Sequence, residues 1–330
     1  MRMAGRSGSV GLVANPHAGK DVRRLVTHAS PTSDAAKIGI VRRAAIGAIE
    51  GGAARLVMAP DAKHLTRRAL EGLDDLVTID ELAMPVDGRP TDTVRAAAML
   101  RDEGVDAVLA LGGDGTSRDI AKGWLDAPLI AISTGTNNVF PRQLEATVAG
   151  LAAGFVVSGR VAASGVSSVS DVVHVQISDG RTDLALVDVA LLAERFVGAR
   201  AVWDPATLRS LVAAISEPAS VGLSAVAAAL MPRPRSCEGG VSVVFGPGRT
   251  VRAPIAPGTF ADLSVATVEL LRAGRTVRWE GPGVLAFDGE RDVVLAPGVS
   301  AELTVRRDGP RVIDVERAMQ LALSHPSTEE

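Results

Sequence analysis

A glycine-rich turn in the first half of the chain has the residue types that phosphate binding requires. It reads Gly112, Gly113, Asp114, Gly115 and Thr116. A buried strand is expected to end at Leu111 before it, and a helix to begin near Ser117 after it. Glycines permit left-handed backbone and leave N–H groups bare, and a helix N-terminus attracts anions. The turn could hold phosphate, although a plain strand-to-helix turn capped by Asp114 fits the same residues.

Three further segments have residues suited to the same chemistry. They are Asn15–Lys20 (NPHAGK), Thr134–Phe140 (TGTNNVF) and Phe287–Glu290 (FDGE). Each has a structural explanation on its own: a strand terminator, a helix cap and a hairpin turn, respectively. Four such segments in one chain are more specific than any one of them. The five histidines show no metal-ligand spacing, and only His17, within the first segment, is placed to touch a ligand.

The elements around the first turn alternate between strand and helix. Apolar runs predict buried strands at 10–14, 55–58, 76–79, 106–111 and 128–132. Helical patterns between them cover 38–50, 62–72, 91–103 and 117–125. This alternation predicts βαβ units and a Rossmann-like parallel sheet, in which ligands bind at the carboxyl ends of the strands. The first domain is expected to span residues 1–142.

The second half of the chain has a different texture. After a helical stretch at 143–155, alternating runs at 172–177, 184–192, 241–245, 276–279, 284–287 and 293–295 predict a mostly antiparallel β domain, a β-sandwich. A helix is expected around 205–215. The second domain is expected to span residues 143–312 and to serve substrate binding or oligomerisation. A closing helix at 313–325 is expected to pack back on the first domain.

Composition excludes several classes of protein. The 330 residues allow two domains, and 35 Lys and Arg against 38 Asp and Glu give a net charge of −3, so no basic field exists for nucleic acid or an anionic membrane. A hydrophobic content of 47% fits a globular protein. The single cysteine, Cys237, cannot form an intramolecular disulfide, and no stretch predicts a membrane helix. A cytoplasmic location is expected.

The four segments, taken in order, resemble the signatures of a kinase superfamily. GGDGT is similar to the motif shared by NAD kinases, diacylglycerol kinases and sphingosine kinases, and NPHAGK is similar to the NPxxG loop of these families. TGTNNVF is similar to the GTGNDF loop of the lipid kinases, and FDGE is similar to the DGE motif of the lipid kinases. The closest likeness is to the ATP-NAD kinase-like family typified by acetoin catabolism protein X. It implies an ATP-dependent kinase that phosphorylates a hydroxyl group, most simply the ribose 2′-hydroxyl of NAD or NADH.

The resemblance also implies roles for individual residues. The triphosphate of ATP, with Mg²⁺, would be held by Asn15, Gly19, Lys20, Gly112, Gly113, Gly115, Thr116, Thr134, Gly135, Thr136, Asn137 and Asn138. Either Asp114 or Glu290 would be the base, and with Glu290 as the base Asp114 would serve the metal. Asp188 and Asp288 would contact substrate. No set of protein side chains is expected to hold a resident metal ion. The resemblance also implies that the protein forms a homodimer or homotetramer.

Two alternatives stay open at this point. NAD kinases have an Asn-Glu pair on a strand of the second domain, where this chain has Val187 and Asp188. Valine cannot hydrogen-bond a nucleoside, so the acceptor could be a lipid or another hydroxylated metabolite instead of NAD. The chain could also be a non-catalytic nucleotide-binding regulator linked to acetoin catabolism.

Overall fold

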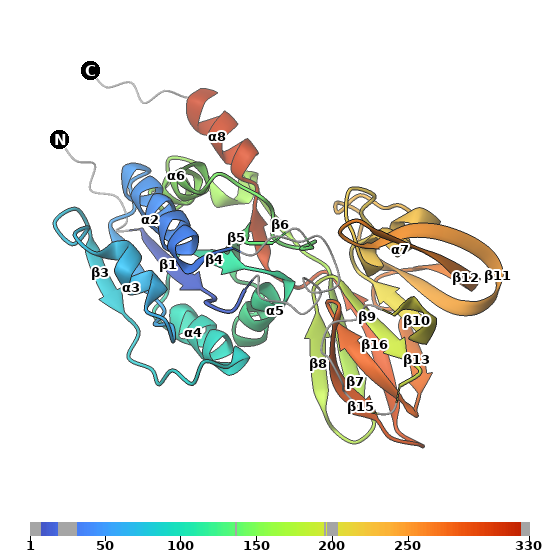
Figure 1. Ribbon diagram of the computed structural model, residues 1–330. Helices are drawn as coiled ribbons and strands as arrows, with labels where there is room; N and C mark the ends of the chain where they lie inside the picture. Colours follow the sequence, from blue (N-terminus) through green and yellow to red (C-terminus); the bar gives the residue numbers. More distant parts are fainter. Residues whose placement is uncertain (1–7, 19–31, 136, 195, 197–203, 325–330) are drawn as a thin grey trace.

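The chain forms two parts that lie side by side, an α/β domain and a β domain (Figure 1). The computed structural model describes residues 8–18, 32–135, 137–194, 196 and 204–324. Among these described residues, no helix is long and apolar enough to cross a membrane.

The α/β domain is built on a seven-stranded sheet. Its strands, in spatial order, are β3 (Thr78–Glu81), β2 (Arg55–Met58), β1 (Ser9–Ala14), β4 (Ala107–Gly112), β5 (Pro128–Ser133), β17 (Arg311–Ile313) and β6 (Ser167–Val169). The first six are parallel, and β6 is antiparallel to β17. The predicted parallel sheet is confirmed, and the carboxyl ends of β1, β4 and β5 meet at one edge.

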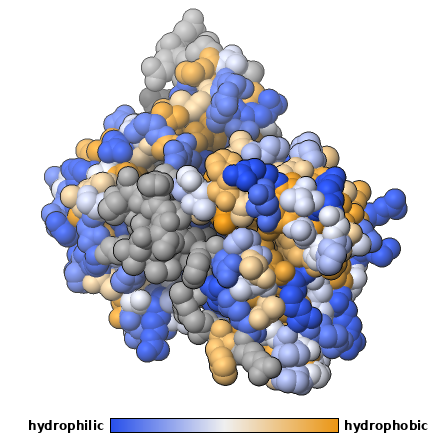
Figure 2. All heavy atoms as spheres, turned by 45° about the vertical axis from the view of Figure 1, so that its right-hand side comes forward, coloured by the Kyte–Doolittle hydropathy of each residue, from blue (hydrophilic) through white to orange (hydrophobic). Residues whose placement is uncertain are grey.

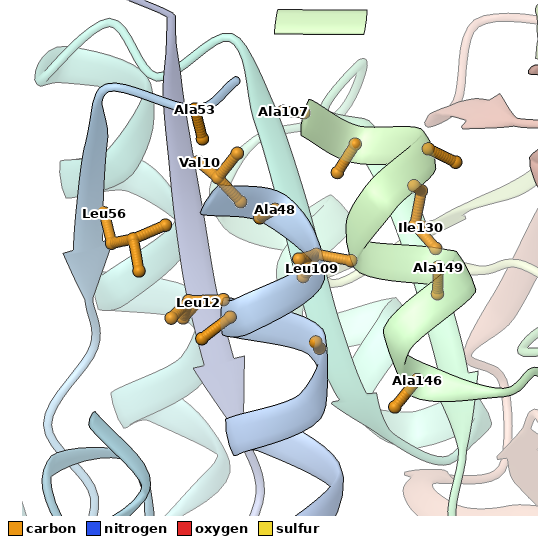
Figure 3. Close-up of a cluster of buried hydrophobic side chains, with 14 of the residues drawn as sticks. Val10, Leu12, Ala48, Ala53, Leu56, Ala107, Leu109, Ile130, Ala146 and Ala149 are labelled. Atoms are coloured by element: carbon orange, nitrogen blue, oxygen red, sulfur yellow. The ribbon is translucent and has the colours of Figure 1, made fainter. Parts of the chain in front are cut away.

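Helices cover both faces of this sheet. On one face lie α2 (Asp34–Glu50), α3 (Leu65–Leu70), α6 (Ala146–Val157) and α8 (Val315–Ser324). On the other lie α4 (Pro90–Asp102) and α5 (Asp114–Gly123). Strand side chains alternate between the two cores: Leu109 faces α2 and α6, as Figure 3 shows, whereas Val108 faces α4 and α5. Burial on both faces explains why these strands read as unbroken apolar runs.

The β domain contains two antiparallel sheets. The larger has the order β12 (Thr259–Leu271), β11 (Gly240–Ala256), β10 (Leu208–Ala213), β9 (Asp188–Leu192), β14 (Gly283–Phe287) and β15 (Glu290–Leu295). The smaller has the order β13 (Thr276–Glu280), β16 (Ser300–Arg306), β7 (Val172–Ile177) and β8 (Thr182–Ala185). One apolar core fills the space between the sheets, and α7 (Leu223–Leu230) covers the outer face of the larger sheet. The predicted antiparallel domain is confirmed.

Two features differ from the sequence-based expectation. The helix expected around 205–215 is wrong: a single 3₁₀ turn at Pro205–Thr207 leads into strand β10, whose apolar residues are buried on both faces. The change of architecture also comes later than the expected boundary after residue 142. Helix α6 packs closely on α2, since a Cβ on Gly150 would lie 1.9 Å from the Ala44 carbonyl oxygen, and β6 joins the first sheet. Helix α8 packs on α6 in the same core.

Candidate active site

The GGDGT turn joins β4 directly to α5, which begins at Asp114, three residues earlier than expected. Gly112, Gly113 and Gly115 all lack a positive φ, so none of them is needed for left-handed backbone, and Gly112 and Gly113 serve close packing instead. A Cβ on Gly112 would lie 2.4 Å from Thr116 Cβ, and one on Gly113 would lie 2.8 Å from Asn138 Oδ1. The turn therefore presents bare backbone at a helix N-terminus, which suits an anion.

Asp114 fastens this turn to the segment that follows β5. Its Oδ1 accepts hydrogen bonds from the backbone N–H groups of Val139 (3.0 Å) and Phe140 (2.7 Å), and its Oδ2 accepts from Val139 (3.1 Å). The side chain is buried, with Asp114 only 9% exposed. The structure therefore brings two of the predicted segments together and gives Asp114 a bracing role that its motif alone did not reveal.

Asn15 joins the first predicted segment to the same place. Its Nδ2 donates to Thr116 Oγ1 at 2.9 Å, and its Oδ1 accepts from the backbone N–H of His17 at 2.8 Å. Beside it, a cavity of about 230 Å³ opens between β1, β2 and the start of α4, with Asn15, His17 and Arg89 among its lining residues. Gly19, Lys20 and Thr136, also predicted to bind ATP, lie outside the described residues.

The segment after β5 has two buried polar atoms that make no hydrogen bond among the described residues. The Asn138 amide donates to Ser133 Oγ at 2.8 Å, and the Thr134 backbone N–H donates to the Gly112 carbonyl at 3.1 Å. By contrast, Thr134 Oγ1 and Asn137 Oδ1 are buried with no hydrogen-bond partner among the described residues. Buried polar groups normally have partners, so these atoms fit the hydroxyl and phosphate groups of a nucleotide.

The DGE turn, between β14 and β15, comes from the second domain. Asp288 is buried at φ 49°, and its carboxylate accepts hydrogen bonds from the backbone N–H groups of Leu186 (3.3 Å), Val187 (2.8 Å) and Asp188 (3.2 Å). Burial raises the pKa of Asp288 to about 6, against the opposing effects of Arg118 and of these hydrogen bonds. This geometry favours a bracing role for Asp288 over the predicted substrate contact.

The pair compared with Asn-Glu of NAD kinases lies deep in the fold. Val187 is 1% exposed and packs in the core shared with Ile215 and Phe140, so the two domains bury apolar surface against each other here. Asp188 is 3% exposed, and its carbonyl accepts from the backbone N–H of Asp288 at 2.9 Å. The Val187 side chain thus belongs to the domain interface.

Arg118 is a connecting residue that the sequence did not single out. From α5 it donates to the Leu184 carbonyl (2.7 Å), Asp183 (2.7 Å) and Asp292 (3.1 Å), and its guanidinium lies 4.4 Å from the ring centroid of Phe287. It is 6% exposed. Since Phe287 and Asp292 flank the DGE turn, Arg118 fixes that turn to the helix of the GGDGT motif.

A second group of charged side chains, Arg235, Glu217 and Arg142, also links the two domains. Arg235 donates to the Val139 carbonyl (2.5 Å) and to Glu217, which also pairs with Arg142 at 3.0 Å. Burial lowers the pKa of Arg235 and opposes the effect of Glu217. The segment that Asp114 holds from one side is therefore also held by the second domain.

Asp119, one turn further along α5, was also missed. Burial raises its pKa to about 7, with smaller contributions from Glu290 and Asp183, while Arg118 and Lys122 act in the opposite direction. The sequence signal that could have identified Asp119 is its position on the predicted helix, five residues after Asp114 of the glycine-rich turn. No group of three or more His, Cys, Asp or Glu side chains in the described ranges could hold a metal ion.

Sequence comparison first shows that the α/β domain is similar to the N-terminal domain of NAD kinases. A family model described as the ATP-NAD kinase N-terminal domain matches residues 10–159. Yeast NADH kinase, solved with NADH, superposes with a TM-score of 0.52 at 13% identity, covering 99% of this chain and 90% of that one. A putative diacylglycerol kinase from Bacillus anthracis str. Sterne gives a TM-score of 0.40 at 13% identity, covering 93% and 98%.

The particular family follows from the second domain and from a full-length relative. A model described as the acetoin catabolism protein X C-terminal domain matches residues 171–308. Acetoin catabolism protein X of Cupriavidus necator is 36% identical over 334 residues, covering 96% of this chain and 92% of that protein. The chain belongs to the acetoin catabolism protein X family, which confirms the resemblance inferred from the four motifs.

Proposed function

We propose that the protein is an ATP-dependent kinase that transfers the γ-phosphate to a hydroxyl group, with the ribose 2′-hydroxyl of NAD or NADH as the acceptor. The observation that carries this proposal is the meeting of three motifs from two domains. The bare GGDGT turn is fastened by Asp114 to the segment after β5 and by Arg118 to the DGE turn. Phosphoryl transfer requires mainly such positioning and charge neutralisation.

The residues present fit a nucleoside triphosphate. The N-terminus of α5 and the backbone of Gly112 and Gly113 would hold phosphate oxygens, and the Thr134 hydroxyl would donate to one of them. The cavity beside Asn15 would take the nucleoside portion. Mg²⁺, when bound with the phosphates, would offset their negative charge, and phosphate oxygens with water would supply its ligands.

Asp114 and Glu290 have different proposed roles. Asp114 holds the segment after β5 in place with both carboxylate oxygens, so its main effect is on the shape of the phosphate site. Because Asp114 is engaged in this way, we assign the role of base to Glu290, which begins β15 next to the turn that Arg118 fixes. A well-positioned base contributes on the order of 10²–10⁴-fold to the rate.

An ATP-consumption screen tests the proposal directly. Purified protein is incubated with ATP and Mg²⁺ or Mn²⁺, and NAD, NADH, nucleosides and diacylglycerol are offered in turn as acceptors. We expect ADP release that depends on NAD or NADH, with formation of NADP or NADPH. Saturable ATP binding without ADP release for any acceptor would refute the kinase function and favour a nucleotide-binding regulator.

A kinase for another hydroxylated metabolite is the second candidate, and the burial of Val187 is the observation that favours it. An NAD kinase uses the corresponding pair to contact its dinucleotide, whereas here that strand contributes to the core. Turnover with a non-nucleotide acceptor, and none with NAD or NADH, would select this candidate.

Self-association through the second domain is also proposed, on family grounds. The hairpin of β11 and β12 leaves Val244, Phe260 and Leu270 42%, 58% and 53% exposed. Figure 2 shows hydrophobic residues among hydrophilic ones on the surface that comes forward from the right of Figure 1. Light scattering after size exclusion would give the molar mass, and a 34 kDa particle would refute a dimer or tetramer.

A further inference from the structure

A cavity of about 410 Å³ lies between the two domains, and it shares no lining residue with the GGDGT turn or with the cavity beside Asn15. From the α/β domain, its lining includes the segment 140–144 after β5, the end of β6 and the start of α8. The β domain contributes Ala214, Ile215 and Arg235. Figure 1 shows β6 and β17, which leads into α8, on the side of the α/β domain that faces the β domain. Cavities of roughly 300–1,000 Å³ at domain interfaces are common binding sites for small molecules.

Apolar side chains from both domains form much of the cavity wall. Phe140, Ile215 and Val315 are buried there, and Leu144 is partly buried. Because apolar walls favour apolar ligand atoms over water, the cavity suits a small molecule with an apolar body.

Arg142 and Arg235 bring spare hydrogen-bond donors to the same cavity. Both guanidinium groups pair with Glu217, Arg142 through Nη1 at 3.0 Å and Arg235 through Nε at 3.1 Å. Arg235 Nη2 donates to Glu217 and to the Val139 carbonyl. A guanidinium has five N–H donors, and Arg142 Nε and Nη2 and Arg235 Nη1 donate to no acceptor in the described part of the chain. The two side chains are 53% and 30% exposed, so a molecule in the cavity can reach them.

The positive charge of this pair of arginines is only partly compensated, because two guanidinium groups share one carboxylate. Burial lowers the pKa of Arg235, and nearby Arg142 lowers it further, against the opposing effects of Glu217 and Asp114. A ligand with a negative charge would remove this imbalance, and charge-assisted hydrogen bonds from arginine to a carboxylate are among the strongest in proteins.

The carboxylates that line the cavity leave this preference for an anion in place. Both oxygens of Asp171 accept hydrogen bonds from Arg307, at 3.2 Å and 2.9 Å, which neutralises that side chain. Asp314 and Glu316, at the start of α8, are exposed, so water and salt screen their charges. Asp314 is also engaged in accepting the backbone N–H of Arg317 at 3.0 Å.

We propose that this cavity is an effector site for a small organic carboxylate with an apolar body. The carboxylate accepts hydrogen bonds from Arg142 and Arg235, and the apolar body packs against Phe140, Leu144 and Ile215. The site is separate from the one proposed for ATP and its acceptor, and its ligand takes no part in phosphoryl transfer.

The segment after β5 connects this cavity to the proposed phosphate site. The Phe140 side chain lines the cavity, while its backbone N–H donates to Asp114 of the GGDGT turn at 2.7 Å. Arg235, on the opposite domain, donates to the carbonyl of the preceding residue, Val139, at 2.5 Å. A carboxylate held by Arg235 and packed on Phe140 would fix this segment in the position that Asp114 requires. Occupancy of the cavity should therefore raise the affinity for ATP, and ATP should raise the affinity for the carboxylate by the same factor.

Three probes that share one ring and differ in charge test the ligand class. Benzoate, benzamide and benzylamine are titrated into the purified protein by calorimetry at neutral pH without nucleotide. We expect saturable binding of benzoate, with benzamide and benzylamine at least roughly tenfold weaker, because only the carboxylate pairs with the arginines. Hexanoate, an anion with a flexible apolar body, is the second probe. If neither anion binds, or if benzamide binds as well as benzoate, the proposal is overturned.

Two variants locate the binding in this cavity. Arg142→Met removes a half-exposed donor, and Leu144→Trp fills space at the apolar wall. Arg278→Met is the matched control, because Arg278 is an exposed arginine that pairs with Glu280 at 2.8 Å on a strand remote from the cavity lining. We expect both cavity variants to weaken benzoate binding at least roughly tenfold, and the control to leave it unchanged. Wild-type benzoate affinity in both cavity variants would refute the site.

ATP calorimetry with and without saturating benzoate tests the effector role. We expect benzoate to tighten ATP binding at least roughly fivefold in the wild type and in Arg278→Met, and to have no effect in Arg142→Met. Equal ATP affinity with and without bound benzoate would refute the effector role. If benzoate binds as expected but the protein binds no ATP, the carboxylate site is supported, whereas its effector role and the kinase function are both refuted.

Discussion

Replacing Asp114 by asparagine should weaken the fold as well as the activity. The carboxylate receives N–H groups on both oxygens. An asparagine side chain keeps one acceptor and turns an NH₂ group toward the Val139 N–H, which now stands 3.1 Å from Oδ2. Losing a buried hydrogen bond to a charged group costs about 1.5–3 kcal/mol. Spread over an α/β domain of this size, that corresponds to a fall in Tm of roughly 3–10 °C.

The measurement is thermal unfolding, followed by ATP calorimetry at a temperature where the variant is folded. Asp126→Asn is the matched control, because it removes the same charge from an exposed position just beyond α5. We expect Asp114→Asn to lower both Tm and ATP affinity, and the control to change neither. Wild-type Tm and ATP affinity, with turnover abolished, would refute the bracing role and restore Asp114 as the base.

Three further predictions concern the same interface. Gly113→Ala should weaken ATP binding at least roughly tenfold by displacing Asn138, whereas Gly115→Ala, where a Cβ has room, should bind ATP normally in calorimetry. Arg118→Met should lower the free energy of unfolding by about 1–3 kcal/mol in urea, because a buried guanidinium that donates to the Leu184 carbonyl, Asp183 and Asp292 is lost; an unchanged midpoint would contradict this. The raised pKa of Asp119 means that the native state keeps a proton up to about pH 7 that the unfolded chain releases near 3.8, so wild-type stability falls between these values. Asp119→Asn should therefore be more stable than wild type at pH 8, by about 1–3 kcal/mol, and equal to it near pH 4.

The sequence predicted the α/β domain well because its signals are local. Strands buried on both faces read as apolar runs, and the glycine turn after Leu111 marks where a strand meets a helix. Strand β10 was mistaken for a helix because its residues contribute to cores on both sides, which removes the alternation that identifies a strand. The domain boundary was set too early because α6 belongs to the first domain through a glycine-lined contact with α2 that no local pattern reveals.

The motifs nominate candidate site residues but do not reveal the contacts between them. Motif residues identified Asn15, Asp114 and Glu290, yet the partners that fix them are distant in sequence: Thr116 for Asn15, and the Val139 N–H group for Asp114. Arg118 and Asp119 follow the motif immediately but have no motif of their own. Their importance depends on charged side chains of the second domain, such as Asp183 and Asp292, which lie next to α5 only in the folded protein.

Burial also changes how substrate choice should be understood. If Val187 faced a bound dinucleotide, asparagine there would add a hydrogen bond to the substrate. The structure instead packs Val187 between the domains, 1% exposed and next to Phe140 and Ile215. An amide at this position would lose its hydrogen bonds with water, at a cost of about 1–3 kcal/mol, and would disturb the segment that Asp114 braces. Discrimination between acceptors must therefore come from side chains other than Val187.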